Sequence, residues 1–128
     1  MTKRMLLIVA HGSRRQTSND EVRTLCERLQ SLRSPDLDGV AVAFLELAEP
    51  DIPTSLAQCV KQGASEIVVF PYFLAAGTHV AADIPEQVEA FRASHPHIKV
   101  TLTPHLGASS TLPHAIMEMA LAEEALAA

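Results

Sequence analysis

The sequence has 128 residues, which fits one domain, and its 48% of apolar residues supplies a sizeable core built from Val, Ile, Leu and Ala, because only 4% are aromatic. Its net charge of −5 argues against nucleic acid as a main partner, since phosphate binding needs a basic face. A mean hydropathy of +0.15 is high for a lone small domain and indicates an apolar patch that is buried in an oligomer.

The first predicted pair of elements is a strand followed by a helix. The apolar run Met5–Ala10 predicts a strand buried on both faces. This run is too short for an export signal or a membrane span, so we expect a soluble, cytoplasmic protein with no membrane partner. The helix is indicated by apolar residues at i, i+3, i+4 and i+7, namely Val22, Leu25, Cys26, Leu29 and Leu32.

The next two pairs repeat this alternation. Val40–Leu45 and Ile67–Phe70 predict two further buried strands. Asp51 and Asp83 each stand just before a proline, as residues that cap the start of a helix do. The two helices are predicted by the stripes Ile52, Leu56, Cys59 and Val60, and then Val80, Ile84, Val88 and Phe91.

The last pair completes the predicted topology. Ile98–Thr103 alternates apolar and polar residues, which is typical of an edge strand. The final helix is predicted by Leu112, Ile116, Met119 and Leu126. Strand–helix alternation implies parallel strands with right-handed crossovers. We therefore predict an α/β protein with one domain over residues 1–128, a three-layer α/β/α architecture and a four-stranded parallel sheet in the order 2-1-3-4.

Chemically active side chains follow the carboxyl ends of the predicted strands. His11 follows the first strand, Glu46 and Glu49 the second, His79 ends the loop after the third, and His105 follows the fourth. Ligands of open parallel sheets bind at this edge. Two imidazoles suit a divalent first-row metal and leave coordination positions free, as a transfer site needs. Plain structural roles for these residues stay open: a histidine bonded to backbone, a helix-entry residue or a solvated carboxylate.

Four short motifs, in order along nearly the whole chain, resemble those of the small CbiX-type sirohydrochlorin chelatases. The first is AHGSR at residues 10–14 with Asn19 beyond it, and the second is FLELAEPDI at 44–52. The third combines PYFL at 71–74, GTH at 77–79 and DIP at 83–85, and the fourth is LG at 106–107. The resemblance implies a chelatase-like half domain, because larger relatives contain two such halves in one chain. One half in a chain implies a homodimer with the active cleft between subunits.

The resemblance also implies what the residues do. The family inserts Co²⁺, in some members Fe²⁺ or Ni²⁺, into sirohydrochlorin on the routes to cobalamin or sirohaem, so the metal is a substrate and no permanently bound cofactor is expected. His11 would bind the metal and accept a proton, His79 would be the second metal ligand, and Glu46 would contact the macrocycle. The loop lining the macrocycle would run from Leu74 through Ala75, Ala76, Gly77 and Thr78 to His79.

Two further expectations concern how this polycarboxylate macrocycle is held. Phe73 is expected to extend the apolar wall of Leu74, Ala75 and Ala76 that stacks on the ring. The turn that contains Arg14 and Arg15 enters a helix, where N–H groups and positive charge favour anions. Ser13 and Thr17 could equally be simple turn or capping groups.

Other functional classes fit the sequence less well. A metal carrier or a tetrapyrrole-binding module on the same fold is the principal alternative, and it would bind Co²⁺ without accelerating insertion. A histidine phosphatase wants an arginine immediately before the histidine, where this chain has Ala10. A receiver-like signalling domain wants an acidic cluster after the first strand, where this chain has His11.

Overall fold

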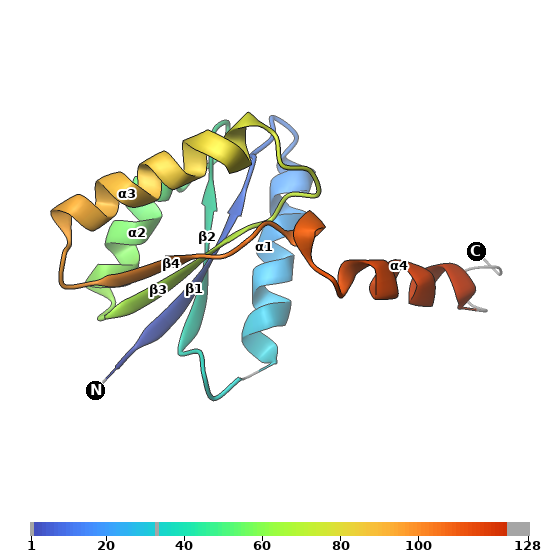
Figure 1. Ribbon diagram of the computed structural model, residues 1–128, viewed down its shortest axis with the longest axis horizontal. Coiled ribbons are helices and arrows are strands. Elements are labelled where there is room, and N and C mark those ends of the chain that lie inside the picture. The colour runs from blue at the N-terminus through green and yellow to red at the C-terminus, as the bar shows by residue number, and fades with distance from the viewer. Residues whose placement is uncertain (1, 33, 123–128) are drawn as a thin grey trace.

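The computed structural model describes residues 2–32 and 34–122, and it confirms the predicted alternation of strands and helices (Figure 1). The strands are β1 (Arg4–Ala10), β2 (Gly39–Phe44), β3 (Glu66–Pro71) and β4 (Lys99–Leu102). The α-helices are α1 (Gln16–Ser31), α2 (Ile52–Lys61), α3 (Ile84–Ser94) and α4 (Leu112–Leu121). Two short helical segments complete the order: the π-helix η1 (His79–Asp83) before α3 and the 3₁₀-helix η2 (Leu106–Ala108) before α4.

The four strands form one parallel sheet in the order β2-β1-β3-β4, as predicted. Helices α2 and α3 cover one face and α1 lies on the other, which gives the three layers (Figure 1). Ala10 at the end of β1 pairs with Phe44 at the end of β2, so the segments that follow these two strands leave the sheet together. The carboxyl edge of the sheet therefore collects the side chains that follow β1, β2 and β3.

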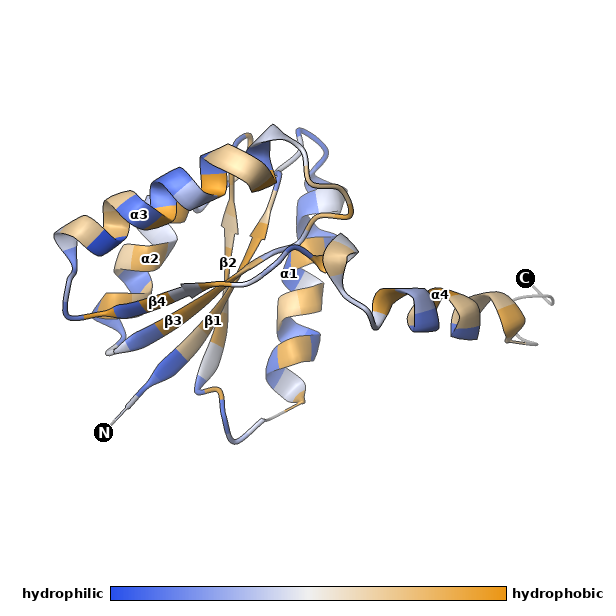
Figure 2. Cartoon of the chain, in the orientation of Figure 1, coloured by the Kyte–Doolittle hydropathy of each residue, from blue (hydrophilic) through white to orange (hydrophobic). Residues whose placement is uncertain are grey.

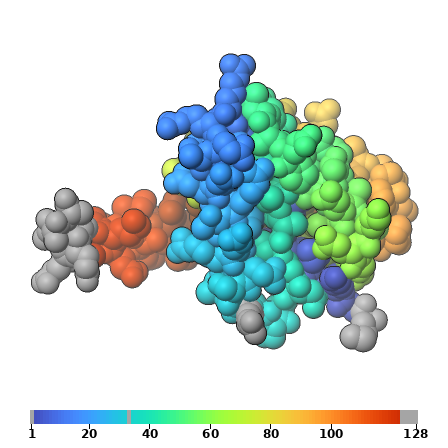
Figure 3. Space-filling model, turned by 180° about the vertical axis from the view of Figure 1, so that it is seen from behind, coloured from blue at the N-terminus to red at the C-terminus, as the bar shows by residue number. Residues whose placement is uncertain are grey.

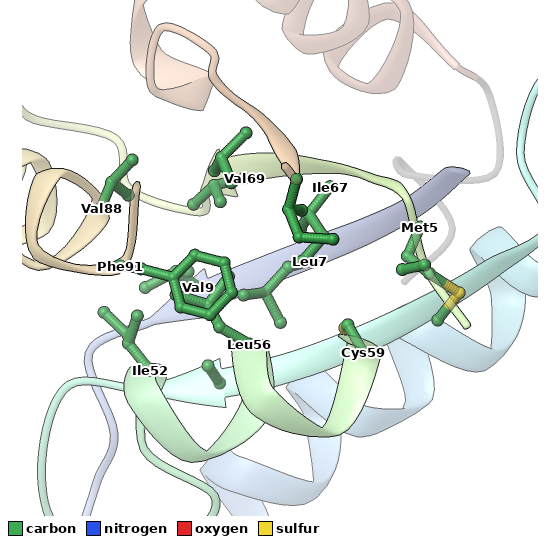
Figure 4. Close-up of a cluster of buried hydrophobic side chains, with 14 of the residues drawn as sticks. Met5, Leu7, Val9, Ile52, Leu56, Cys59, Ile67, Val69, Val88 and Phe91 are labelled. Atoms are coloured by element: carbon green, nitrogen blue, oxygen red, sulfur yellow. The ribbon is translucent and has the colours of Figure 1, made fainter. Parts of the chain in front are cut away.

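The core lies between the sheet and the helices α2 and α3 (Figure 4). Alternate side chains of the strands point into it, because successive residues of a strand face opposite sides. Leu7, Val9 and Ile67 are fully buried there against Ile52 and Leu56 of α2. Figure 2 shows the same separation, with hydrophobic residues along the strands and polar residues on the outer sides of the helices. None of the described helices is long and apolar enough to cross a membrane.

The two predicted capping residues differ in what they do. Asp51 accepts a hydrogen bond from the Thr54 backbone N–H at 2.8 Å, which caps α2 and holds the pKa of its carboxyl below the usual range. The same prediction is wrong for Asp83. Its backbone is helical, because η1 runs directly into α3, and its side chain caps no N–H group.

Helix α4 begins where the sequence predicts, but it does not pack on the sheet. It projects away from the body of the domain on the side of α1 (Figures 1 and 3). Leu126, which the sequence pattern assigned to this helix, lies outside the described residues. The α1 layer therefore contains a single helix where it covers the sheet of this chain.

Candidate metal and macrocycle site

His11 and Glu46 are brought together by the backbone beyond β1 and β2. The Glu46 N–H donates to the His11 carbonyl oxygen at 3.1 Å, one step past the last pair of the two strands. Gly12 then turns with φ 95°, and a Cβ atom on it would lie 1.7 Å from the Glu46 carbonyl oxygen. Only glycine fits this close approach. As a result, Nε2 of His11 lies 3.9 Å from Oε1 of Glu46.

Asn19 of α1 secures this turn. Its side chain accepts a hydrogen bond from the Ser13 N–H at 2.9 Å and donates one to the Ser13 carbonyl oxygen at 2.8 Å. Asn19 is only 3% exposed, so both of its polar atoms are satisfied inside the protein. In the sequence Asn19 was recognised only as part of a motif. Its structural role could have been predicted, because Asn19 is a polar residue on the side of the first predicted helix that faces the sheet.

His79 lies beside His11, although 67 residues separate them in the chain. The two ring centroids are 4.9 Å apart and the ring planes are tilted by 52°. Nδ1 of His79 lies 2.7 Å from Oδ2 of Asp83, one turn further along the π-helix. The side chains of His11 and His79 are 45% and 40% exposed, so both rings are accessible from solvent.

The hydrogen bonds define which ring nitrogen carries the proton. Nδ1 of His11 lies 3.0 Å from the Gly12 carbonyl oxygen, which can only accept a hydrogen bond. The Asp83 carboxylate also only accepts, so Nδ1 is the protonated nitrogen in both neutral rings. Each Nε2 therefore keeps its lone pair for a metal ion or a proton.

A pocket of about 380 Å³ adjoins His79 and Glu46. Its wall is formed by Leu45, Glu46, His79, Asp83, Glu86, Gln87 and Ala90. It is thus rich in carboxylates, which suits a cation better than an anion. Among the described residues, the candidate site included, no group of three or more His, Cys, Asp or Glu side chains is arranged to hold a metal ion.

The loop between β3 and η1 lies at the same edge. Leu74 is 72% exposed, and residues 75–78 are exposed as well. Phe73 instead packs against the core, so it supports the loop from beneath. The Gly107 N–H donates to the Phe73 carbonyl oxygen at 3.0 Å, and a Cβ on Gly107 would lie 1.8 Å from the Leu74 carbonyl oxygen. The close packing of Gly107 against the Phe73–Leu74 backbone therefore holds the loop in place.

The remaining candidates are less closely tied to the two rings. Arg14, Arg15 and Glu49 are exposed, with the arginines in the turn before α1. His105 is half-buried before η2, and within residues 2–32 and 34–122 no ring contact joins it to His11 or His79. His97 lies at the amino end of β4, at the opposite edge of the sheet.

Comparison with known proteins identifies the family of this chain. The sequence profile of the CbiX family matches residues 5–123. A sirohydrochlorin ferrochelatase of Bacillus subtilis is 32% identical over 114 residues, which are 89% of this chain and 43% of that protein. A sirohydrochlorin cobaltochelatase of Methanopyrus kandleri is 35% identical over 83 residues, which are 65% of this chain and 57% of that protein. The chain thus spans about half the length of these curated relatives.

Solved structures agree with the sequence comparison. A putative cobalamin biosynthesis CbiX protein from Marinobacter aquaeolei superposes with a TM-score of 0.77 at 29% identity, covering 91% of this chain and 93% of that one. The sirohydrochlorin chelatase SirB from Bacillus subtilis subspecies spizizenii, solved in complex with cobalt, superposes with a TM-score of 0.81 at 31% identity. That match covers 93% of this chain and 50% of SirB.

Proposed function

This chain belongs to the CbiX family, and we propose that it inserts a divalent metal ion into sirohydrochlorin. The observation that carries the proposal is the pair of imidazoles 4.9 Å apart, each with Nε2 free to bind a metal. One ion about 2.1 Å from each nitrogen is compatible with this spacing. Co²⁺ is the metal we propose first, with Fe²⁺ and Ni²⁺ as alternatives, because imidazole ligands accept all three.

The reaction requires that the ion lose water and that two pyrrole N–H groups lose their protons. We assign metal binding to His11 and His79, which hold the ion from one side and leave its other positions for the macrocycle. As the pyrrole nitrogens take over the ion, Nε2 of His11 is released and accepts one pyrrole proton, and the second proton passes to solvent water. Glu46, whose Oε1 lies 3.9 Å from that nitrogen, contacts the macrocycle.

The macrocycle is held by the loop after β3 in this proposal. Leu74 offers the most exposed large apolar side chain there, next to Ala75, Ala76, Gly77 and Thr78. Stacking a flat ring on this loop removes apolar surface from water on both partners. Phe73 contributes from below by keeping the loop in place, since its own side chain packs on the core.

Arg14 and Arg15 are expected to attract the carboxylates of the macrocycle. Changing both to alanine should raise the KM for sirohydrochlorin by about two- to thirtyfold at low salt, because each exposed charge pair contributes about 0.2–1 kcal/mol. The kcat should stay within twofold, and added salt should shrink the difference in KM. Arg28→Ala, which removes an exposed charge at the far end of α1, is the matched control. An unchanged KM in the double variant would remove both arginines from the proposal.

Asp83 is expected to act as a positioning residue through His79. Asp83→Ala should weaken Co²⁺ binding by about 10–100-fold, because an acceptor that orients a metal-binding histidine contributes this much. Asp83→Asn keeps an acceptor oxygen and should retain most of the affinity. Binding is measured by titrating Co²⁺ into the protein and following the visible d–d absorption of the bound ion. Glu89→Ala controls for the lost charge, since Glu89 lies in α3, which follows η1 directly, and pairs with Arg92. Equal affinity in Asp83→Ala and wild type would contradict the assignment.

The remaining parts of the proposal concern assembly and location. We propose one chelatase domain over residues 1–128 that works as a homodimer in the cytoplasm, with sirohydrochlorin and the metal as substrates and no permanent cofactor. Its support is the match to a relative of similar length, of which this chain covers 93%.

The decisive experiment follows absorbance while the protein, sirohydrochlorin and Co²⁺, Fe²⁺ or Ni²⁺ are mixed. A chelatase accelerates the spectral change of metallation well above the rate with free metal, and turns over more than once per protein. A carrier or a tetrapyrrole-binding module would bind a substrate and leave that rate unchanged. The second outcome, with all three metals, would overturn the proposed function.

A further inference from the structure

Leu47 adopts a backbone conformation that leucine normally avoids. Its φ is 64°, and among residues 2–32 and 34–122 no other residue apart from glycine has a positive φ. The branched side chain of leucine makes this region costly, whereas glycine enters it freely. Backbone strain of this kind persists where the surrounding structure imposes it, and it clusters at functional sites. The presence of leucine at position 47 therefore needs a physical reason.

Packing inside the domain does not supply that reason. The side chain of Leu47 is 51% exposed, whereas Leu45, two residues earlier, packs against the core. A side chain that stays half in water gains little from folding. A glycine at position 47 would relieve the strain and leave the core intact.

The segment that carries Leu47 is held on both sides of it. Before Leu47, the backbone N–H of Glu46 donates to the carbonyl oxygen of His11 at 3.1 Å. After Leu47, the guanidinium of Arg23 in α1 donates to the carbonyl oxygen of Glu49 at 2.9 Å. The surrounding structure thus imposes the strained conformation and fixes the place of the exposed leucine.

Leu47 and Leu74 follow the two strands that flank β1. Leu47 comes after β2 and Leu74 after β3, and β1, which leads to His11, lies between these strands (Figure 1). Two strand spacings separate the ends of β2 and β3 by about 10 Å. A flat tetrapyrrole centred over His11 and His79 is wide enough to reach both leucines.

The space beside Leu47 continues into the space of the candidate site. A pocket of about 620 Å³ adjoins Leu47, and Glu46, Glu49 and Asp51 form part of its wall. Leu45 and Glu46 also line the pocket of about 380 Å³ described above, so the two pockets meet at this segment. The three carboxylates disfavour an anionic group beside Leu47. What this leucine offers a ligand is therefore an apolar contact.

We infer that Leu47 makes an apolar contact with the macrocycle, on the other side of the ion from the contact made by Leu74. Binding of the ring takes the exposed leucine out of water, and this gain is the reason for a leucine at a strained position. The inference rests on the proposed function and names a further substrate-binding residue of the same site.

The first experiment titrates metal-free sirohydrochlorin into the protein and follows the absorbance of the macrocycle. Leu47→Gly should raise the Kd about 3–10-fold, because taking the exposed half of a leucine side chain out of water contributes this much. Leu47→Met keeps an apolar side chain of similar volume and should stay within about twofold of wild type. The loss in Leu47→Gly should be the same at low and high salt, since no charge is removed. An unchanged Kd in Leu47→Gly, or an equal loss in Leu47→Met, would overturn the inference.

The second experiment measures the urea unfolding of the same variants. Leu47→Gly should unfold at a higher urea concentration than wild type, because glycine adopts the positive φ without strain. Weaker binding of the macrocycle in a more stable protein is the result expected for a residue that serves the ligand. A lower unfolding midpoint in Leu47→Gly would show that the leucine serves the fold, and the inference would then be wrong.

Two controls separate the contact with the macrocycle from other roles. Leu32→Gly removes a leucine that is 75% exposed at the end of α1, and it should leave the Kd for sirohydrochlorin unchanged. The affinity of Leu47→Gly for Co²⁺ and its mass by light scattering should both match wild type. A weaker Co²⁺ affinity would mean that Leu47 supports the metal ligands, and a changed mass would mean that it serves a contact between subunits. Either result would contradict the inference.

Failure of the inference and failure of the proposed function give different results. Binding of metal-free sirohydrochlorin needs no metal insertion, so a tetrapyrrole-binding module could depend on Leu47 without being a chelatase. A protein that inserts metal, and whose Leu47→Gly variant binds sirohydrochlorin as tightly as wild type, would overturn the inference alone. A wild-type protein that does not bind sirohydrochlorin would overturn both.

Discussion

Replacing His11 with alanine is expected to lower the rate of Co²⁺ insertion into sirohydrochlorin by about 10²–10⁴-fold. The side chain has two roles in the proposed reaction, as a metal ligand and as the acceptor of a pyrrole proton. His79 has only the first role, so His79→Ala should cost less, about 10–100-fold. The same absorbance assay measures both. The comparison of the two rate losses is informative, because equal losses in His11→Ala and His79→Ala would mean that His11 does not accept the proton.

The controls for this prediction are a histidine variant elsewhere in the chain and a measurement of folding. His97→Ala removes an exposed imidazole at the opposite edge of the sheet and should leave the rate unchanged. Circular dichroism should be the same for all three variants, since the side chains of His11 and His79 are 45% and 40% exposed and contribute little to packing. Wild-type rates in both His11→Ala and His79→Ala would show that the site is elsewhere.

The second large effect is expected from Gly12→Ala, which adds one methyl group at the turn after β1. Its Cβ would lie 1.7 Å from the Glu46 carbonyl oxygen, so the segment after β2 must move. The positive φ of 95° adds a cost of about 1–3 kcal/mol for any residue with a side chain. Because misplacing a reacting group by about 1 Å costs roughly 10²-fold in rate, insertion should fall at least that far in whatever protein remains folded.

Gly63→Ala separates the effect of the positive φ from the effect of the steric clash with Glu46. Gly63 has a φ of 98°, but a Cβ there would meet only the Lys3 side chain, at 3.8 Å. Its variant should lose about 1–3 kcal/mol of unfolding free energy and keep the wild-type insertion rate. Denaturant titration and the absorbance assay measure the two quantities. If Gly12→Ala were no less stable than Gly63→Ala and equally active, the close approach to Glu46 would not be needed.

Much of this protein is determined by local patterns in its sequence. The apolar runs and helical stripes predicted all four strands, the four helices and the sheet order, because buried parallel strands and amphipathic helices each require a characteristic spacing of apolar residues. The strand ends then placed His11 and Glu46 at one edge, since parallel strands end at the same edge. Such predictions succeed because they depend on residues that lie close together in the chain, within one helix or one strand.

Other features were decided only by tertiary structure. Asp83 looked like a helix cap, and its carboxylate instead orients His79, because a π-helical turn places the two side chains together. The need for glycine at position 12 arises from the carbonyl of Glu46, which is 34 residues away. The apolar stripe of α4 correctly predicted a helix, but only the structure shows that this helix does not pack on its own sheet. Contacts between distant segments leave no periodic trace in the sequence, so only the folded chain reveals them.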